Sequence, residues 1–131
     1  RLVRHGPFTS ESGYALAKEL LTHSEAGGPP DALFCGNDVI ALGALQYAQE
    51  TGIRVPQELC IAGFDGISYA SLAQIRLTTI RQDRQRMGET ATHLLLDEIE
   101  SNSEPAVQKV LLTPTLLAQA TTGDMRLDGA R

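Results

Sequence analysis

The fold of this chain is decided by the stretch Ala32-Leu-Phe-Cys-Gly-Asn-Asp-Val-Ile-Ala-Leu-Gly-Ala-Leu45. Its first four residues are apolar without alternation, which is typical of a strand covered on both faces. Gly36 provides a turn, and both Asn37 and Asp38 can cap a helix, because their side-chain oxygens accept from unpaired N–H groups of the first turn. A strand that leads into a helix in this way is the basic unit of an open parallel α/β sheet, whose ligands bind at the carboxyl ends of the strands. Asn37 is therefore predicted to lie where a ligand binds.

The rest of the chain repeats this alternation of strand and helix. Apolar periodicity and turn residues predict strands at residues 2–5, 32–35, 59–62, 77–80, 110–112 and 115–118, helices at 11–23, 38–51 and 86–100, and a short helical turn at 67–73. Gly52 is expected to end the central helix, and the polar tail from Thr121 is expected to be frayed. This order predicts the α/β class, with a doubly wound parallel sheet and right-handed crossovers.

Length and composition are those of an ordinary globular domain. The chain has 131 residues, of which 42% are hydrophobic and 21% are charged. No apolar run approaches the length that spans a bilayer, so a soluble chain without membrane contact is expected. The formal charge is −5, and basic residues are scattered except in residues 76–86, where no aromatic residues alternate with them. These features give little support to nucleic-acid binding by this segment itself.

The cysteines and histidines do not form a recognisable reactive or metal site. Cys35 and Cys60 lie in strand-like apolar runs, where a free thiol behaves as a small buried hydrophobe, and a reducing compartment fits best. A disulfide between them stays open as an alternative if their strands are neighbours. The three histidines are dispersed, and no P-loop or GxGxxG turn occurs. We therefore expect no metal, no cofactor and no enzymatic activity. The chain begins at Arg1 without a methionine or a signal peptide, and we interpret it as a fragment.

Four candidate binding residues follow successive predicted strands. Phe8, Asn37, Asp65 and Gln82 each come just beyond a strand's carboxyl end, so these four positions should meet at one edge of the sheet. Together they offer a carboxylate that accepts hydroxyl hydrogens, two amides that both donate and accept, and an aromatic face for stacking. A charge-assisted hydrogen bond contributes roughly 1.5–3 kcal/mol, so Asp65 is expected to contribute more affinity than either amide. The pattern predicts a site for a polyol or a nucleobase.

The same residues also have purely structural explanations, which the sequence leaves open. Asn37 can serve only as a helix cap, and Asp65 can serve only as a turn residue within Gly-Phe-Asp-Gly. A phenylalanine such as Phe8 is more often part of a core than a stacking platform. Either Asp65 or Asp38 could instead act as the acid or base of an α/β enzyme.

Several motifs, in order and with matching spacing, resemble the lactose/galactose repressor (LacI/GalR) family. They are Ser12-Gly-Tyr14, Pro30-Asp-Ala-Leu-Phe-Cys-Gly-Asn-Asp-Val-Ile-Ala-Leu-Gly-Ala44, Gly52-Ile-Arg-Val-Pro56, Ile61-Ala-Gly-Phe-Asp65, Leu77-Thr-Thr-Ile-Arg-Gln82 and Met87-Gly-Glu-Thr-Ala91. The resemblance extends from Gly6 to about Ala118. The family consists of bacterial transcription regulators with an N-terminal helix-turn-helix and a two-subdomain core that resembles type I periplasmic binding proteins. This chain resembles the later part of that core.

The resemblance implies a division of the chain and a role for each site residue. Residues 1–82 and 112–120 resemble the C-terminal effector-binding subdomain, residues 83–111 resemble a segment of the N-terminal subdomain, and residues 121–131 form a polar tail. The DNA-binding domain is absent from this chain. Family positions that match Phe8, Asn37, Asp65 and Gln82 line the effector cleft, with Gln82 at the hinge. The family's dimer interface draws on the matching helix 38–51 and the segment after Asp65, which implies a homodimer.

The function implied is the effector-binding and dimerisation part of a cytoplasmic, DNA-binding transcriptional repressor. Its expected partners are a small-molecule effector, either a sugar or a nucleoside, and operator DNA that is contacted through the absent helix-turn-helix. The alternative is a periplasmic sugar-binding protein with the same core fold, serving a transport or chemosensory system. The two cysteines in strand-like apolar runs and the motifs that resemble those of repressors favour the regulator.

Overall fold

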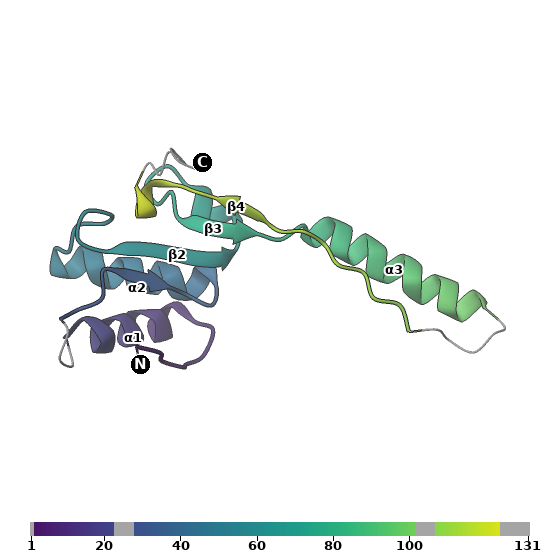
Figure 1. Ribbon diagram of the computed structural model, residues 1–131, viewed down its shortest axis with the longest axis horizontal. Helices are drawn as coiled ribbons and strands as arrows, with labels where there is room; N and C mark the ends of the chain where they lie inside the picture. The colour runs from purple at the N-terminus through teal and green to yellow at the C-terminus, as the bar shows by residue number, and fades with distance from the viewer. Residues whose placement is uncertain (1, 23–27, 102–106, 124–131) are drawn as a thin grey trace, which may run out of the picture. The chain divides into compact units, whose positions relative to one another are not determined.

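The computed structural model describes residues 2–22, 28–101 and 107–123, which form alternating helices and strands (Figure 1). Their order is α1 (Ser10–Thr22), β1 (Ala32–Phe34), α2 (Asp38–Thr51), β2 (Cys60–Asp65), the 3-10 turn η1 (Ser68–Ser71), β3 (Thr78–Arg81), α3 (Arg84–Glu100), β4 (Thr115–Leu117) and the 3-10 turn η2 (Ala120–Thr122). The chain divides into two compact units. The first unit comprises Arg1–Arg81 with Leu116–Arg131, and the second unit comprises Gln82–Thr115.

The described strands form one sheet in the order β1-β2-β3-β4. β1 pairs with β2 in parallel, with Leu33 opposite Ile61, and β2 pairs with β3 in parallel, with Gly63 opposite Thr79. Parallel neighbours end at the same edge of a sheet, so the carboxyl ends of β1, β2 and β3 come together. The expected α/β class with a parallel sheet is confirmed.

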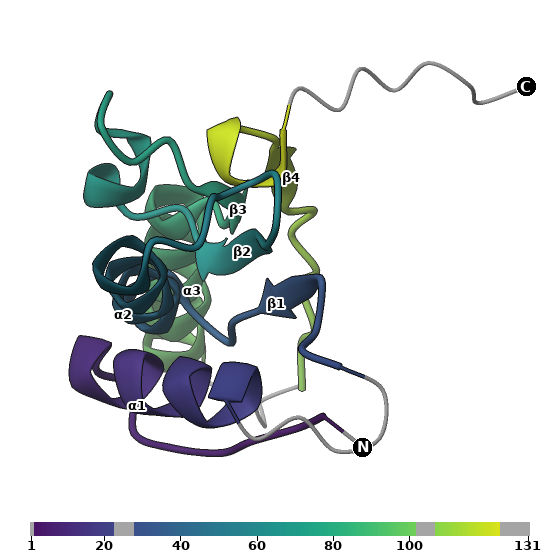
Figure 2. The same ribbon diagram turned by 90° about the vertical axis from the view of Figure 1, so that its left-hand side faces the viewer.

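The central helix α2 begins and ends at the residues that local sequence rules predict. The side chain of Asn37 accepts a hydrogen bond from the backbone N–H of Ile40 at 2.8 Å, which satisfies one unpaired donor of the first turn. At the other end, Gly52 adopts a left-handed conformation with φ of 74°, and its N–H bonds back to the last turn. α2 packs against both β2 and α1 (Figure 2).

Two glycines allow α1 and α2 to cross at close range. A Cβ atom on Gly13 would overlap the backbone carbonyl of Ile40, and one on Gly43 would overlap the carbonyl of Ser10. Beside this crossing, the rings of Tyr14 and Tyr47 meet edge to face with centroids 5.3 Å apart. The backbone contact therefore depends on small residues in both helices, as in other close helix crossings.

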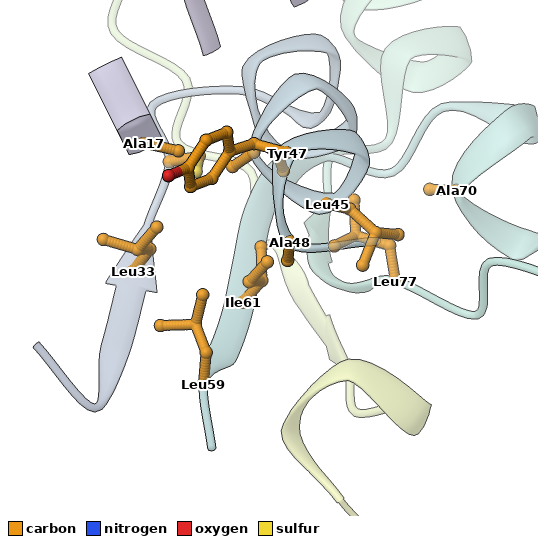
Figure 3. Packing of buried hydrophobic residues seen from close by; sticks show 12 residues of the cluster. Ala17, Leu33, Leu45, Tyr47, Ala48, Leu59, Ile61, Ala70 and Leu77 are labelled. Atoms are coloured by element: carbon orange, nitrogen blue, oxygen red, sulfur yellow. The ribbon is translucent and has the colours of Figure 1, made fainter. Parts of the chain in front are cut away.

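The core lies between α2 and the sheet (Figure 3). Leu59 just before β2 and Ile61 within it lie on the side of α2 that carries Ala48, and Leu77 packs near Leu45. The buried hydrophobic residues are Ala17, Leu33, Cys35, Ala41, Ala44, Leu45, Tyr47, Ala48, Leu59, Ile61, Ala70 and Leu77. This apolar layer holds α2 on the sheet and thereby positions the carboxyl ends of the strands.

Two predicted strands are wrong. Residues 2–5 and residues 110–112 are not in strand conformation, although valine and leucine in both runs favour one. A strand exists only where a neighbour completes its hydrogen bonds, and the sheet of the described residues pairs neither run. Strand β4 is present, but it ends at Leu117. The first helix is confirmed over Ser10–Thr22, and position 23, its predicted end, lies outside the described residues.

The prediction of a frayed tail from Thr121 is also wrong for residues 121–123. Thr121 is buried in η2, where its hydroxyl donates to the carbonyl of Ile61 at 2.7 Å and accepts from the N–H of Thr78 at 2.9 Å. These hydrogen bonds satisfy the buried hydroxyl, so a polar residue packs here without penalty. The remainder of the predicted tail, residues 124–131, lies outside the described residues.

Candidate functional site

The carboxyl edge of the sheet brings together three of the four predicted site residues. The N–H of Cys35 bonds to the carbonyl of Ala62 at 2.8 Å, so the residues that follow β1 lie beside the end of β2. Asn37 follows β1 and Asp65 is the last residue of β2. Phe8 reaches the same edge, because a Cβ on Gly36 would lie 3.9 Å from its ring atom Cε1. Gln82 follows β3 directly in the chain and is the first residue of the second unit.

Phe8 is an exposed aromatic residue and not part of the core. Its side chain is 74% exposed. This observation removes the explanation of Phe8 as a core residue. An exposed phenyl ring beside a polar edge offers a flat apolar face to a ring-shaped ligand.

Asn37 uses its two polar atoms differently. Its Oδ1 is committed to the helix cap through the hydrogen bond from the N–H of Ile40. The amide nitrogen Nδ2 carries two hydrogens and is a donor only. Capping and ligand binding are therefore compatible in this residue, and Asn37 would act toward a ligand as a donor.

Asp65 adopts a backbone conformation that aspartate rarely takes. Its φ is 110°, and the next residue, Gly66, has φ of 66°. Gly66 is required there for a second reason, since a Cβ would come within 2.7 Å of the Cβ of Arg81. Left-handed conformations at residues other than glycine cost free energy and are concentrated at functional sites. Asp65 is the last residue of β2 and is paired with Arg81 of β3, so it is a strand residue and not a turn residue.

The neighbouring acidic residue, Asp38, is enclosed within the protein. Its side chain is 0% exposed. Its Oδ1 accepts a hydrogen bond from the hydroxyl of Thr79 at 2.5 Å, and its Oδ2 accepts one from the N–H of Ile67 at 2.8 Å. A carboxylate in this position cannot reach a bound molecule, so Asp38 is not suited to be an acid or base. The sequence signal for this arrangement was Gly63, because a glycine within a strand often marks a close approach.

A cavity of about 510 Å³ lies along β1, and Phe8 and Gly36 at the carboxyl edge are among its lining residues. Most of the lining is apolar and includes Leu16, Leu20 and Leu33 of α1 and β1. Neither Asn37, Asp65 nor Gln82 lines this cavity. The polar groups of the candidate site therefore lie outside it.

Both cysteines are free thiols, so the alternative of a disulfide between them is not realised. Cys35 is buried, and this burial raises the pKa of its thiol from 9.0 to about 11. Within the described ranges, no group of three or more histidine, cysteine, aspartate or glutamate residues is arranged to hold a metal ion. Among the same residues, no helix combines the length and apolarity that crossing a membrane requires.

A parallel α/β sheet with polar side chains at its carboxyl edge is the general architecture of α/β ligand-binding domains. Within that class, the model of the periplasmic binding protein-like domain family matches residues 1–122. The chain belongs to this family, and the similar proteins include PurR repressors and LacI-family transcriptional regulators. The resemblance of its sequence motifs to that group is thus confirmed.

Individual relatives support this assignment. An HTH-type transcriptional repressor PurR from Erwinia tasmaniensis is 39% identical over 119 residues, which are 91% of this chain and 34% of the relative. The crystal structure of the lac repressor dimer bound to operator and the anti-inducer ONPF matches with a TM-score of 0.77 at 30% identity, over 90% of this chain and 34% of that chain. A LacI family regulator from Arthrobacter sp. FB24 in complex with lactose matches with a TM-score of 0.75 at 27% identity, over 87% of this chain and 41% of that chain. The chain spans about a third of the length of the curated relatives it matches.

Proposed function

We propose that this chain is the effector-binding and dimerisation portion of a bacterial DNA-binding transcriptional repressor that responds to a small sugar or nucleoside. The observation that carries the proposal is the convergence of Phe8, Asn37 and Asp65 at the carboxyl edge of a periplasmic binding protein-like sheet. The relatives named above are transcriptional repressors and regulators, which favours a regulator over a transport protein with the same fold.

Each site residue has a distinct proposed role in binding the effector. The carboxylate of Asp65 accepts hydrogen bonds from ligand hydroxyls or ring N–H groups, and the Nδ2 of Asn37 donates. The ring of Phe8 stacks on the apolar face of a sugar or on a base. Gln82 is the fourth ligand residue, placed where the chain passes from the first unit to the second. The regulator from Arthrobacter sp. FB24 is described as a complex with lactose, which supports the sugar.

We further propose that the two parts of the chain belong to two subdomains of a larger regulator. Residues 1–82 and 112–120 would form the C-terminal subdomain, and residues 83–111 would belong to the N-terminal subdomain. The second compact unit, Gln82–Thr115, supports this division. Its helix α3 has no buried residue and exposes Met87, Leu95, Leu96 and Ile99. Such an exposed apolar face is expected if the rest of the N-terminal subdomain packs on it in the larger regulator.

The proposed partners are a second copy of the protein and operator DNA. Dimerisation would use α2 and the segment after Asp65, where Tyr69 and Leu72 are exposed. The DNA contact is proposed for a helix-turn-helix outside this chain, since the formal charge here is −5. The lac repressor neighbour is described as a dimer bound to operator, which supports both partners. The free thiols of Cys35 and Cys60 support a cytoplasmic location. This portion would bind its effector without catalysing a reaction.

The test replaces Asp65→Asn and measures binding of a panel of lactose, sucrose, other simple sugars and nucleosides by calorimetry. We expect at least a tenfold loss of affinity for the compound that binds the unmodified protein, because a charge-assisted hydrogen bond is lost. Asp31→Asn is the matched control, since Asp31 is an exposed aspartate just before β1 and so lies at the opposite end of that strand. Equal affinity of the Asp65→Asn variant and the unmodified protein would overturn the site. In a full-length regulator, Asp65→Ala should abolish the effector response and leave operator binding intact.

A further inference from the structure

The conformation of the segment that carries Asp65 needs an explanation. Asp65 and Gly66 both have positive φ, at 110° and 66°. Glycine adopts positive φ at no steric cost because it lacks a Cβ, whereas the Cβ of an aspartate makes this conformation unfavourable. Such a conformation persists only where surrounding contacts over-determine it. The backbone just after Asp65 should therefore be held by specific hydrogen bonds.

Those hydrogen bonds come from a buried pair, Asp38 and Thr79. The N–H of Gly66 donates to the hydroxyl oxygen of Thr79 at 3.3 Å, and that hydroxyl donates to Oδ1 of Asp38 at 2.5 Å. The N–H of Ile67 donates to Oδ2 of Asp38 at 2.8 Å. Two consecutive backbone N–H groups after Asp65 are thus tied to one carboxylate, the first through a hydroxyl and the second directly.

The protein makes room for this pair at a place where a buried charge is tolerated. Asp38 is the first residue of α2, so its carboxylate lies at the helix N-terminus, where the helix dipole favours negative charge. A Cβ on Gly63 would overlap Oδ1 of Asp38, so the glycine in β2 opens the space. Thr79 is 1% exposed, and both carboxylate oxygens accept hydrogen bonds, as a buried charge requires.

We propose that Asp38 and Thr79 are positioning residues, which hold the backbone after Asp65 so that its carboxylate is presented at the carboxyl edge of the sheet. The role of that carboxylate in binding an effector rests on the proposed function. The holding of the backbone rests on the hydrogen bonds alone. Asp38 itself is enclosed and takes no part in contacting the ligand.

The first test measures amide hydrogen exchange in the full chain, without any ligand. Thr79→Val keeps the shape of the side chain and removes the hydroxyl, and Thr79→Ser keeps the hydroxyl. Thr78→Val is the matched control, because Thr78 is also buried, in the same strand, but its hydroxyl bonds to Gln119 and Thr122. We expect Thr79→Val to accelerate exchange at Gly66 and Ile67 by roughly 10- to 100-fold relative to the core amides. Thr79→Ser and Thr78→Val should leave these two amides near their unmodified rates.

Equal acceleration in Thr78→Val and Thr79→Val would overturn the proposal, because it would reflect general loss of stability. So would unchanged exchange at Gly66 and Ile67 in a folded Thr79→Val variant. If Thr79→Val does not fold, Asp38→Asn replaces it, since the amide keeps the size of the carboxylate and removes an acceptor.

The second test links the held backbone to binding, with the compound from the panel that the unmodified protein binds. Thr79→Val should reduce its affinity about tenfold or more, Thr79→Ser should restore it, and Thr78→Val should leave it within about threefold. Loosened amides with unchanged affinity would refute the positioning role. Unchanged affinity in Asp65→Asn would instead refute the proposed function, and the exchange measurement would still decide whether Asp38 and Thr79 hold the backbone.

Discussion

Replacing Gly63→Ala should destabilise the first unit through a single methyl group. The new Cβ would overlap Oδ1 of Asp38 and lie 3.2 Å from both the Cα of Asp38 and the Cβ of Ala41. Two of these neighbours belong to the backbone or to a rigid methyl group, so a rotamer change alone cannot relieve the contact. Either β2 moves away from α2, or the carboxylate of Asp38 leaves its hydrogen bonds with Thr79 and Ile67.

The magnitude of this effect follows from the two ways of relieving the contact. Overpacking of a well-filled interior costs about 1–3 kcal/mol. If the carboxylate moves instead, loss of one hydrogen bond to a charged group costs roughly 1.5–3 kcal/mol. By either route, we therefore expect Gly63→Ala to lower the free energy of unfolding by roughly 1–3 kcal/mol. Urea denaturation followed by circular dichroism measures this value, provided that the slope m is unchanged.

Gly36→Ala is the matched control for the same change at the same sheet. A Cβ on Gly36 meets only Cε1 of Phe8, at 3.9 Å. The free energy of unfolding of the Gly36→Ala variant should therefore differ from that of the unmodified protein by no more than about 0.5 kcal/mol. A double-mutant cycle with Asp38→Ala gives a further test, because removing the carboxylate frees the space that the methyl group needs. Strict additivity of Gly63→Ala and Asp38→Ala, or a Gly63→Ala effect as small as that of Gly36→Ala, would refute this reasoning.

Two further predictions concern Cys35 and Phe8. Because burial raises the pKa of the Cys35 thiol from 9.0 to about 11, the folded protein retains a proton that the unfolded chain releases, and stability falls as pH rises from about 9 to 11. Relative to Cys35→Ala, the unmodified protein should lose about 1.4 kcal/mol of unfolding free energy between pH 7 and pH 10, and parallel pH profiles would contradict this. Phe8→Ala should change the free energy of unfolding by no more than about 0.5 kcal/mol relative to the unmodified protein, because the ring is 74% exposed. Calorimetry should show weaker binding of the panel compound to this variant. A large loss of stability would contradict the prediction.

Local rules predicted the central strand and helix well, because the determining groups are close in sequence. Asn37 caps α2 and Gly52 ends it, as the residue types indicate. The two failed strands, at residues 2–5 and 110–112, begin with β-branched or aliphatic residues, but their conformation depends on a distant hydrogen-bonding neighbour. Hydrophobic pattern alone does not report whether that neighbour is present. The same limit applies to Thr121, whose burial depends on partners in β2 and β3.

The edge that carries the candidate site was predictable, but the division of labour between Asn37 and Asp38 was not. Both residues can cap a helix, and sequence rules do not choose between them. Once Asn37 takes the cap, Asp38 becomes the first residue of α2, and its side chain is directed toward β2 and β3 instead of solvent. Asn37 thus lies at the edge and Asp38 is enclosed, and this difference is a consequence of tertiary packing.

Strand β3 shows why a threonine pair differs from the valine pair that the strand pattern would equally allow. Successive side chains of a strand point to opposite faces, so Thr78 and Thr79 serve different neighbours. The hydroxyl of Thr79 bonds to Asp38 on the side of α2, and the hydroxyl of Thr78 bonds to Gln119 and Thr122 of the returning chain. Valine would keep the β-branched shape and the strand while leaving a carboxylate oxygen and backbone groups short of partners. The hydroxyls therefore connect β3 to the segment after Asp65 and to η2. They contribute to the fold through these hydrogen bonds more than through strand propensity.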